Sequence, residues 1–315
     1  MLGIDVGGTK VAVARIEGAA AHDGVEHPTD VDSTEQLLAG IEAGVAEVVK
    51  SCGRPDAVGV GVPSQIEFST GTVLSSVNIP LEGVPLREEL GKRLGVPVFV
   101  DNDANCAALA EAQLVPDPPA QHLVMLTLGT GVGGGLVIDG AIERGHTGLG
   151  AELGHVIVDG REALAATEEG FPRAGSLELK CSGTGLERAA TQAAAANPGG
   201  TLGRLLAGGG RVTGRAVVAA AEDGDSEALG LFHAHGRWLG LGIASFVNTF
   251  EPQYVVIGGG LSRAAGLFLD TAIEEAARHT LPALWERTEV RLAEGGSDAG
   301  VVGAGLLAAQ EIAGA

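Results

Sequence analysis

Residues 1–18, MLGIDVGGTKVAVARIEG, decide how the first part of the chain folds. The apolar run LGIDV reaches an aspartate, passes through two glycines, a threonine and a lysine, and returns as a second β-rich run, VAVARI. Two such runs joined by a Gly-rich turn are typical of a β-hairpin. The stretch therefore predicts a hairpin and leaves open whether its turn also holds a phosphate group.

The residues of this turn suit phosphate binding. Gly7 and Gly8 carry no side chain, so a ligand oxygen can approach the backbone N–H groups, to which Thr9 and Lys10 add a hydroxyl group and a cation. Asp5, at the end of the first run, is placed to hold a Mg²⁺ ion through a water molecule. On this segment alone, a plain hairpin turn and a phosphate-binding turn are equally supported.

A second Gly/Thr turn between two strand-like runs occurs in the middle of the chain. LGTGVGGG, residues 128–135, again joins strand to strand, and Gly129, Thr130 and Gly131 form a second turn rich in backbone donors. A dinucleotide-binding fingerprint would continue as a helix, and no Walker pattern is present. The repeat predicts two similar lobes that face each other across a cleft and grip a polyphosphate group.

Strand-like runs alternate with Ala/Leu/Glu-rich helical stretches along the chain, which is typical of an α/β fold. The predicted strands are 2–6, 11–16, 57–63, 96–100, 122–128, 135–139 and 254–260, and the clearest helices are 33–49 and 104–114. The Pro-rich break VPDPPAQ, residues 115–121, predicts an N-terminal lobe over 1–115 and a larger C-terminal lobe over 116–299. A small-residue helix over 300–315 is expected to pack back onto the first lobe.

Composition narrows the class of function. The 315 residues include 20 Lys and Arg against 40 Asp and Glu, a net charge of −20 that opposes binding to nucleic acid or to anionic lipid. Three separated cysteines, Cys52, Cys106 and Cys181, suggest neither a disulfide framework nor a metal cluster. No signal-like leader and no apolar run of about 18 residues is evident. We therefore expect a cytoplasmic protein that does not associate with membranes.

Five motifs, in this order, resemble those of the ROK family of sugar kinases, bacterial glucokinases above all. They are LGIDVGGTK (2–10), VFVDNDANCAALAE (98–111), LTLGTGVGGG (126–135), GLGAELGHV (148–156) and EPQYVVIGGGLS (251–262). The resemblance covers nearly the whole chain. It implies the actin/hexokinase-like (ribonuclease H-like) fold and ATP-dependent phosphorylation of a hexose, with Mg²⁺ as the cofactor and a homo-oligomer, dimer or tetramer, as the assembly.

Asp103 is the predicted catalytic residue of the sugar kinase that the resemblance implies. The sequence predicts that a strand stops at Val100 and that a helix begins near Ala104, where an aspartate is most often an N-cap. By resemblance, Asp103 is the base that takes the proton from the attacking sugar hydroxyl. The two roles are compatible, because a helix N-terminus keeps a carboxylate ionised. By resemblance, Asn102 binds sugar hydroxyls, whereas Asn105 is expected to support the local turn.

Further sugar ligands follow from the resemblance. A Glu–His pair such as Glu152 and His155 is, by itself, more often a structural contact than a site. By resemblance these two side chains contact hydroxyls on the reducing-end side of the sugar, and such polar groups reject analogues that lack the matching hydroxyl. Glu178 aligns with a further sugar-binding glutamate, and Glu187 is the less favoured alternative.

One segment departs from the family pattern. Relatives carry three cysteines that join the equivalent of His155 in a zinc site, but here Glu169, Phe171 and Ser176 stand in those places and Cys181 falls outside the pattern. One histidine and one carboxylate are too few for a closed zinc site. The sequence therefore predicts no zinc. It predicts that segment 160–175 is held by packing, with Phe171 in place of the metal and Cys181 as a buried filler.

Glycines 258–260, with Gly258 and Gly259 as the candidate ligands, end a strand where a nucleotide base or ribose could lie against bare backbone, although a plain strand-to-helix turn fits equally well. The leading prediction is a glucokinase that phosphorylates the 6-hydroxyl with ATP. Kinases for mannose, fructose or an N-acetylhexosamine, and a polyphosphate-dependent glucokinase, stay open as alternatives. A ROK-type sugar-sensing repressor is disfavoured, because no helix-turn-helix segment or basic patch precedes the first motif.

Overall fold

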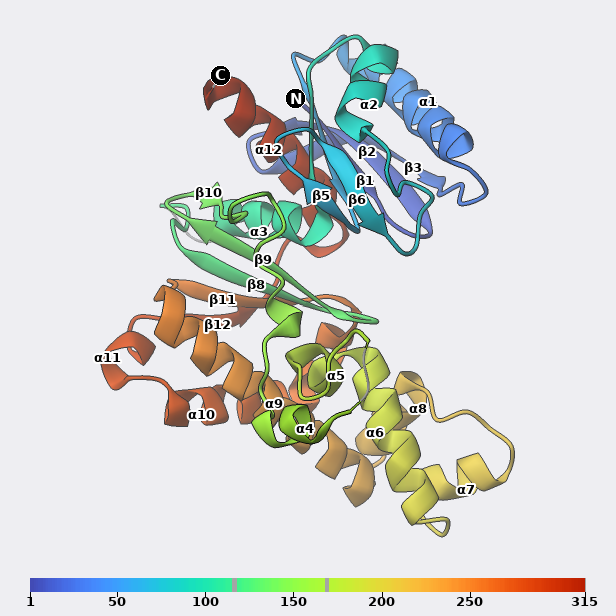
Figure 1. Ribbon diagram of the computed structural model, residues 1–315, viewed down its shortest axis with the longest axis vertical. Coiled ribbons are helices and arrows are strands. Elements are labelled where there is room, and N and C mark those ends of the chain that lie inside the picture. The colour runs from blue at the N-terminus through green and yellow to red at the C-terminus, as the bar shows by residue number, and fades with distance from the viewer. Residues whose placement is uncertain (115–117, 168–169, 315) are drawn as a thin grey trace. The chain divides into compact units, whose positions relative to one another are not determined.

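The computed structural model describes residues 1–114, 118–167 and 170–314 (Figure 1). The strands are β1 (Leu2–Val6), β2 (Lys10–Glu17), β3 (Ala20–Pro28), β4 (Val58–Val62), β5 (Ser64–Glu67), β6 (Thr72–Ser76), β7 (Val98–Asn102), β8 (Leu123–Leu128), β9 (Val132–Ile138), β10 (Ala141–Ile142), β11 (Tyr254–Gly258) and β12 (Glu289–Leu292).

The helices alternate with these strands. They are α1 (Thr34–Cys52), α2 (Leu86–Leu94), α3 (Asp103–Leu114), α4 (Gly160–Ala165), α5 (Leu177–Cys181), α6 (Gly183–Ala196), α7 (Thr201–Ala207), α8 (Gly214–Glu222), α9 (Ser226–Phe250), α10 (Leu269–His279), α11 (Pro282–Trp285) and α12 (Ala299–Gly314), with short 3₁₀ turns at Leu153–His155, Gly260–Leu267 and Gly296–Asp298. No helix in the described ranges is both long and apolar enough to span a membrane.

Two five-stranded sheets share one strand order. The first runs β3-β2-β1-β4-β7 and the second β10-β9-β8-β11-β12, so each strand of one sheet has a counterpart at the same place in the other. In the first sheet, β1 pairs antiparallel with β2 and parallel with β4, and β4 pairs parallel with β7. In the second, β9 pairs antiparallel with β10 and β11 pairs parallel with β12. The internal repeat predicted from the two Gly/Thr turns is confirmed at the level of whole sheets.

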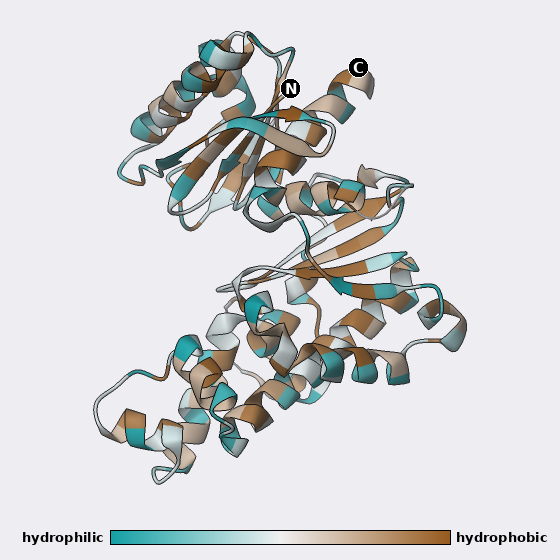
Figure 2. Cartoon of the chain, turned by 180° about the vertical axis from the view of Figure 1, so that it is seen from behind, coloured by the Kyte–Doolittle hydropathy of each residue, from teal (hydrophilic) through white to brown (hydrophobic). Residues whose placement is uncertain are grey.

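The alternation in LGIDV and VGVGV explains how the first sheet is covered. Successive residues of a strand point to opposite faces. Leu2, Ile4 and the valines of β4 are fully buried and form one core cluster with apolar residues of α1 and α2. The residues between them, Gly3 and Gly59, face α12, where a Cβ would come within 1.9 and 1.7 Å of backbone oxygens. Hydrophobic residues run along the strands of both sheets (Figure 2).

α12 also packs directly on α3, the helix that begins at Asp103 (Figure 1). Gly303 lies at this contact, and a Cβ there would lie 1.7 Å from the backbone oxygen of Cys106. Side chains of Cys106, Leu109 and Leu307 fill the remaining space. The approach of the two helices therefore depends on small residues.

We expect Gly303→Ala to lower the free energy of unfolding by about 3 kcal/mol, because backbone atoms cannot yield to the new methyl group. A matched control is Gly40→Ala in α1, where nothing lies within 4 Å of the new Cβ. That change should raise stability by up to about 1 kcal/mol through helix propensity. Urea unfolding of both variants tests this, and equal stabilities would contradict the packing described here.

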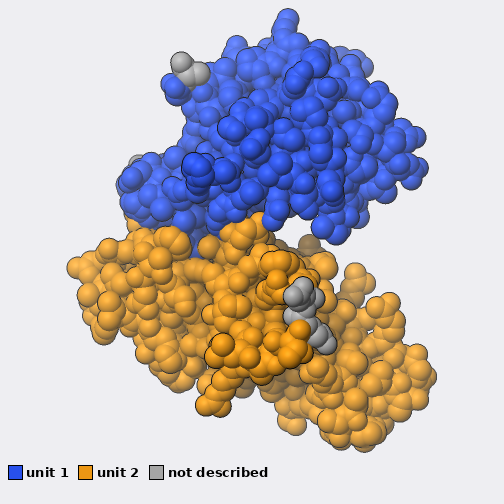
Figure 3. All heavy atoms as spheres, viewed as in Figure 1, with its two compact units in different colours: residues 1–125, 135–151, 293–315 blue, residues 126–134, 152–292 orange. Residues whose placement is uncertain are grey.

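The chain separates into two compact units (Figure 3). Unit 1 comprises residues 1–125, 135–151 and 293–315, and unit 2 comprises 126–134 and 152–292. The units interleave along the chain, so the predicted lobe boundary after residue 115 stays a prediction. α12 packs against β1, β4 and α3, all of which belong to unit 1.

The predicted strands and helices are present, with two corrections near Asp103. β7 continues through Asn102 rather than stopping at Val100, and α3 begins at Asp103 rather than near Ala104. The extra pairs Gly61↔Asp101 and Val62↔Asn102 with β4 extend the strand, although its last residues are polar. Asn102 and Asp103 therefore stand at a direct junction of strand and helix.

Candidate active site

The first Gly/Thr turn is a closed hairpin within unit 1. Gly7 N donates to Lys10 O at 2.8 Å, and Thr29 Oγ1 donates to Gly7 O at 2.6 Å. Gly8 and Thr9 are exposed at the tip, whereas the Lys10 ammonium group is paired with Glu26 on β3. The tip therefore offers backbone donors to a ligand, and the charge of Lys10 is partly neutralised.

Asp5 lies between this turn and the start of α12. A Cβ on Gly300, the second residue of α12, would lie 2.5 Å from Asp5 Oδ2, so the carboxylate needs a glycine there. Burial, and then the charge of Asp103, raise the pKa of Asp5 to about 6. Two neighbouring carboxylates offer oxygen ligands of the kind that Mg²⁺ prefers. These residues therefore fit the cation that the resemblance implies.

The raised pKa of Asp5 predicts a pH-dependent stability. The carboxyl group of Asp5 loses its proton near pH 3.8 in the unfolded chain and near pH 6 in the folded chain. The contribution of the protonated group to the free energy of unfolding is therefore fully present below about pH 4 and is lost as the pH rises through 6. Asp5→Asn should therefore be more stable than the wild type at pH 8, by about 1–3 kcal/mol. The difference should vanish near pH 4. Thermal unfolding in metal-free buffer at both pH values measures it, and a variant less stable at pH 8 would contradict the assignment.

Asn102, rather than Asp103, provides the main N-cap of α3. Asn102 Oδ1 accepts from Ala104 N at 2.9 Å and from Asn105 N at 3.3 Å, which satisfies two of the free N–H groups of the first turn. Asn102 Nδ2 donates to Ser64 O at 3.4 Å. Asp103 Oδ1 also accepts from Ala104 N, at 2.9 Å. The capping role considered for Asp103 thus falls mostly to its neighbour.

The second Gly/Thr turn lies within unit 2 and is braced by two helices. Gly183 N at the start of α6 donates to Gly129 O at 2.8 Å, and Thr184 Oγ1 donates to Thr130 O at 2.8 Å. On α5, Glu178 Oε2 accepts from Val132 N at 2.8 Å. This contact occupies a backbone donor directly after the turn.

Gly131 is required for that contact. A Cβ on Gly131 would lie 2.4 Å from Glu178 Oε2, whereas a Cβ on Gly129 would meet nothing closer than 4.0 Å. The sequence predicted that both glycines open the backbone to phosphate. The bare Cα of Gly131 instead makes room for a carboxylate of the protein itself.

A pocket of about 850 Å³ lies beside this turn in unit 2. It is lined by Gly129, Thr130, Gly183, Thr184, Glu187, Gly214, Arg215, Val218, Ala219, Glu222, Gly260, Leu261, Arg263 and Ala264. Its volume lies in the range of small-molecule sites. Two arginines and two glutamates give it ligands for both phosphate and hydroxyl groups.

Of glycines 258–260, which were predicted to lie by the nucleotide, only Gly260 lines this pocket. Gly258 is the buried last residue of β11, and Gly259, with φ +85°, lies against the backbone of Leu128. Glu187, the alternative sugar ligand, also lines the pocket and accepts from Gly214 N at 2.7 Å. Glu178 is not among the residues that line this pocket, and its carboxylate contacts Val132 N instead.

Glu152 and His155 flank one 3₁₀ turn, Leu153–His155, in unit 2. His155 Nε2 lies 3.8 Å from Glu152 Oε2, and His155 Nδ1 has no hydrogen-bond partner among the described residues. The ring of Phe171 packs edge-on against the His155 ring, with centroids 5.5 Å apart. An aromatic contact therefore orients this histidine.

The segment that departs from the family pattern is held by packing and by an ion-pair cluster. Lys180 Nζ contacts Asp159 Oδ2 at 2.8 Å and Glu162 Oε2 at 2.5 Å, and lies 4.5 Å from the ring centroid of Trp238. This cluster, which the sequence did not suggest, ties α4 to α5.

The residues that stand in the cysteine positions have other roles. Ser176 is fully buried and caps α5 by accepting from Leu179 N at 3.2 Å, and Cys181 is fully buried, as expected of a filler. Glu169 lies outside the described residues. Within the ranges that the structure describes, no three His, Cys, Asp or Glu side chains gather in a way that could hold a metal ion.

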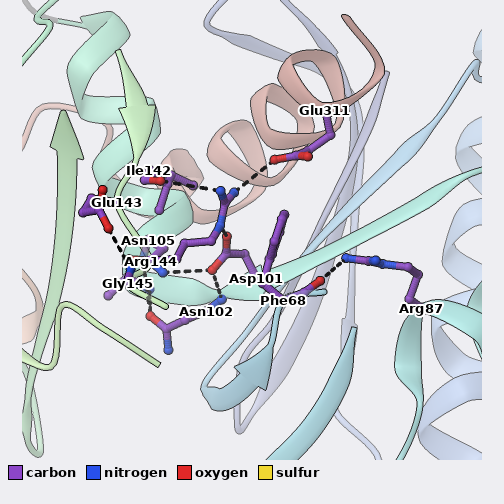
Figure 4. Close-up of polar contacts among 11 residues, drawn as sticks. Phe68, Arg87, Asp101, Asn102, Asn105, Ile142, Glu143, Arg144, Gly145 and Glu311 are labelled. Carbon is purple, nitrogen blue, oxygen red and sulfur yellow. Dashed lines mark hydrogen bonds and ion pairs between the residues drawn. The ribbon is translucent and has the colours of Figure 1, made fainter. Parts of the chain in front are cut away.

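Two residues near Asp103 were missed by sequence reasoning. Asp101, only 2% exposed, accepts hydrogen bonds from Asn105 Nδ2 at 2.8 Å and from Arg144 Nε at 2.6 Å (Figure 4). The order Asp-Asn-Asp in the sequence shows which residues are adjacent, but it does not show that the first aspartate is buried against an arginine 43 positions away.

The duplicated sheet order defines an α/β fold of the actin/hexokinase-like class, which solved structures share. A ROK hexokinase from Thermus thermophilus is 32% identical with a TM-score of 0.87, and 100% of this chain and 99% of that chain are covered. A ROK family glucokinase from Streptomyces griseus, solved with glucose and AMPPNP, is 32% identical with a TM-score of 0.76 over 98% of this chain and 99% of that chain.

Sequence comparison agrees with the structures. The model of the ROK family matches residues 1–311. A glucokinase of Halalkalibacterium halodurans is 33% identical, with 98% of this chain and 95% of the relative covered. An N-acetyl-D-glucosamine kinase of Aliivibrio salmonicida is 31% identical, with 97% of this chain and 98% of the relative covered. The chain belongs to the ROK family.

Proposed function

We propose that this protein is a sugar kinase that transfers the γ-phosphoryl group of ATP to the 6-hydroxyl of glucose. The observation that carries the proposal is the match over nearly the full chain to glucokinases at 32–33% identity, one of them solved with glucose and an ATP analogue. The pocket of about 850 Å³ beside the second turn supports a nucleotide as the donor.

Asp103 is the general base in this mechanism. Its backbone is fixed at the start of α3, where the helix N-terminus favours the ionised carboxylate. The carboxylate accepts the proton of the attacking hydroxyl as the bond from oxygen to phosphorus forms, and ADP leaves with the electrons of the broken bond. Such a base contributes orientation and late proton acceptance in a loose phosphoryl transfer.

The remaining site residues bind the substrates. Gly7, Gly8, Thr9 and Lys10 would offer donors to the phosphates, as would Gly129, Thr130 and Gly131, and the nucleoside would lie by Gly258 and Gly259, next to Gly260 of the pocket. Asp5 would hold Mg²⁺ through water, and the ion would neutralise charge on the phosphates. Asn102, Glu152, His155 and Glu178 would bind sugar hydroxyls. These assignments rest on the family motifs.

An N-acetylhexosamine is the second candidate substrate, because an N-acetyl-D-glucosamine kinase is nearly as similar in sequence as the glucokinases. A coupled assay for ADP with glucose, mannose, fructose and N-acetylglucosamine tests both, with ATP and polyphosphate as donors. We expect the highest kcat/KM for glucose and ATP. No turnover with any hexose would refute the proposed function.

The proposal extends to the setting of the enzyme. We propose that it works in the cytoplasm as a homo-oligomer, a dimer or a tetramer, without nucleic acid or membrane partners. The net charge of −20 supports the absence of nucleic-acid binding. Light scattering coupled to size exclusion gives the oligomeric state, and a monomer at micromolar concentration would overturn that part.

We also expect the purified protein to contain no stoichiometric zinc. Buried Ser176 is engaged in capping α5, and the ring of Phe171 packs against His155, so His155 is oriented without a metal. A strong chelator followed by restored Mg²⁺ should leave the activity unchanged. Elemental analysis that finds about one zinc per chain would contradict this.

A further inference from the structure

Asp101 is a buried carboxylate with several donors. Its Oδ1 accepts from the backbone N of Asn102 and from Asn105 Nδ2, both at 2.8 Å, and its Oδ2 accepts from Arg144 Nε at 2.6 Å (Figure 4). The residue directly precedes the pair Asn102–Asp103. Asp101 therefore fixes the end of β7 from which α3 starts.

Arg144 is the charged partner that balances Asp101. Its side chain is 15% exposed, its Nη2 lies 3.3 Å from Glu311 Oε1 on α12, and its guanidinium carbon lies 3.7 Å from the centroid of the Phe68 ring. Asp101 on β7, Glu311 on α12 and Phe68 just after β5 thus hold one planar group. A guanidinium group suits this place because it forms directed hydrogen bonds at its edge and stacks by its face.

The backbone around Arg144 is equally constrained. Arg144 O accepts from Gly150 N at 2.8 Å, and Thr147 O accepts from Phe68 N at 3.2 Å. A Cβ on Gly148 would lie 2.7 Å from Phe68 N. The loop 144–150 is therefore closed at its base and docked on the chain around Phe68, which holds the backbone of Arg144 in place.

We propose that Arg144 is a positioning residue for phosphoryl transfer, which holds Asp101 so that the Asn102 cap and the Asp103 carboxylate keep their direction at the start of α3. The proposal rests on the proposed function, in which Asp103 is the base. It goes beyond the family motifs, because Arg144 lies outside all five of them.

The experiment compares Arg144→Met with Arg87→Met. Arg87 is a matched control because its guanidinium carbon also lies by the Phe68 ring, at 5.4 Å, and its Nη1 donates to Ser69 O, but it has no bond to Asp101. We expect Arg144→Met to lower kcat by about 10- to 100-fold, as a displaced catalytic group would. KM for ATP should change by less than about twofold, because the pocket in unit 2 is built from other residues. Arg87→Met should keep kcat.

A second cycle tests whether Arg144 acts through Asp101. In the Asp101→Asn background, the further change Arg144→Met should lower kcat no more than about twofold, since contacting pairs are not additive. An equal loss of kcat in both backgrounds would overturn the proposal, as would a similar loss of kcat in Arg87→Met. Arg144→Lys should fall between the wild type and Arg144→Met, because an ammonium group can reach Asp101 but cannot also stack on Phe68.

Hydrogen exchange supplies a readout that does not need the activity. Backbone amides in a peptide over 98–106 should lose protection in Arg144→Met and keep it in Arg87→Met. If the wild type phosphorylates no sugar, the proposed function fails, and the exchange result still decides the positioning role. If Arg144→Met does not fold, Arg144→Lys carries the test, and kcat and protection equal to the wild type would overturn the proposal.

Discussion

Replacing Asp103 by asparagine should lower kcat by about 10²–10⁴-fold and leave the fold intact. The amide keeps the shape of the side chain, and its oxygen can still accept from Ala104 N as the carboxylate does at 2.9 Å. Only the ability to take a proton is lost. Glucose affinity should change little, because an amide still accepts and donates hydrogen bonds.

A surface variant controls for the change of charge. The side chain of Asp139 is 87% exposed and its residue has φ +51°, which asparagine tolerates, so Asp139→Asn should keep both kcat and stability. Initial rates at saturating ATP and glucose, with calorimetric glucose titrations, measure the effect. If Asp103→Asn retained more than about a third of the wild-type kcat, Asp103 would not be the base.

Gly131→Ala should lower kcat/KM for both substrates by about 10²-fold, the scale expected when site groups move by about an ångström. The new methyl group would displace the Glu178 carboxylate from Val132 N, so it disturbs a proposed sugar ligand and the second turn together. Stability should fall little, because the displaced atoms are the far end of a flexible side chain.

Gly129→Ala is the matched control within the same turn, since its Cβ meets nothing closer than 4.0 Å. Gly129→Ala should lower kcat/KM by less than about fivefold, because no neighbouring atom must move to make room for the new methyl group. Substrate-saturation curves for ATP and glucose separate the outcomes. A Gly131→Ala enzyme that is impaired toward ATP alone would restore the simpler view that this glycine only admits phosphate.

Much of the fold could be predicted from the sequence, because buried strands are locally apolar. The runs LGIDV and VGVGV are buried almost throughout, with apolar side chains on one face and Gly3 and Gly59 on the face where α12 packs. β3 was not predicted, since AAHDGVEHP is mostly exposed and has no apolar alternation. Its place is set by pairing with β2, not by its own composition.

The candidate site was predictable as a set of residues but not as a set of contacts. Gly/Thr turns and the Asp-Asn-Asp order are local patterns, so the sequence could indicate Asp5, Asn102 and Asp103. The Glu178 contact to Val132 N spans 46 positions, and the Arg144 contact to Asp101 spans 43. Partners this far apart are chosen by tertiary packing, which no local pattern records.

The packing of α12 on β1 has a consequence for how the chain folds during synthesis. The ribosome makes β1 long before α12, the helix that covers Gly3 and Gly59, which follows every other described element along the chain. Until then, one face of the earliest sheet lacks its cover, and exposed sheet faces of this kind attract chaperones and other nascent chains. Most of unit 2 lies between β1 and α12 in the sequence, so it can fold before α12 covers this face of the sheet. Unit 1 is therefore begun first and completed last.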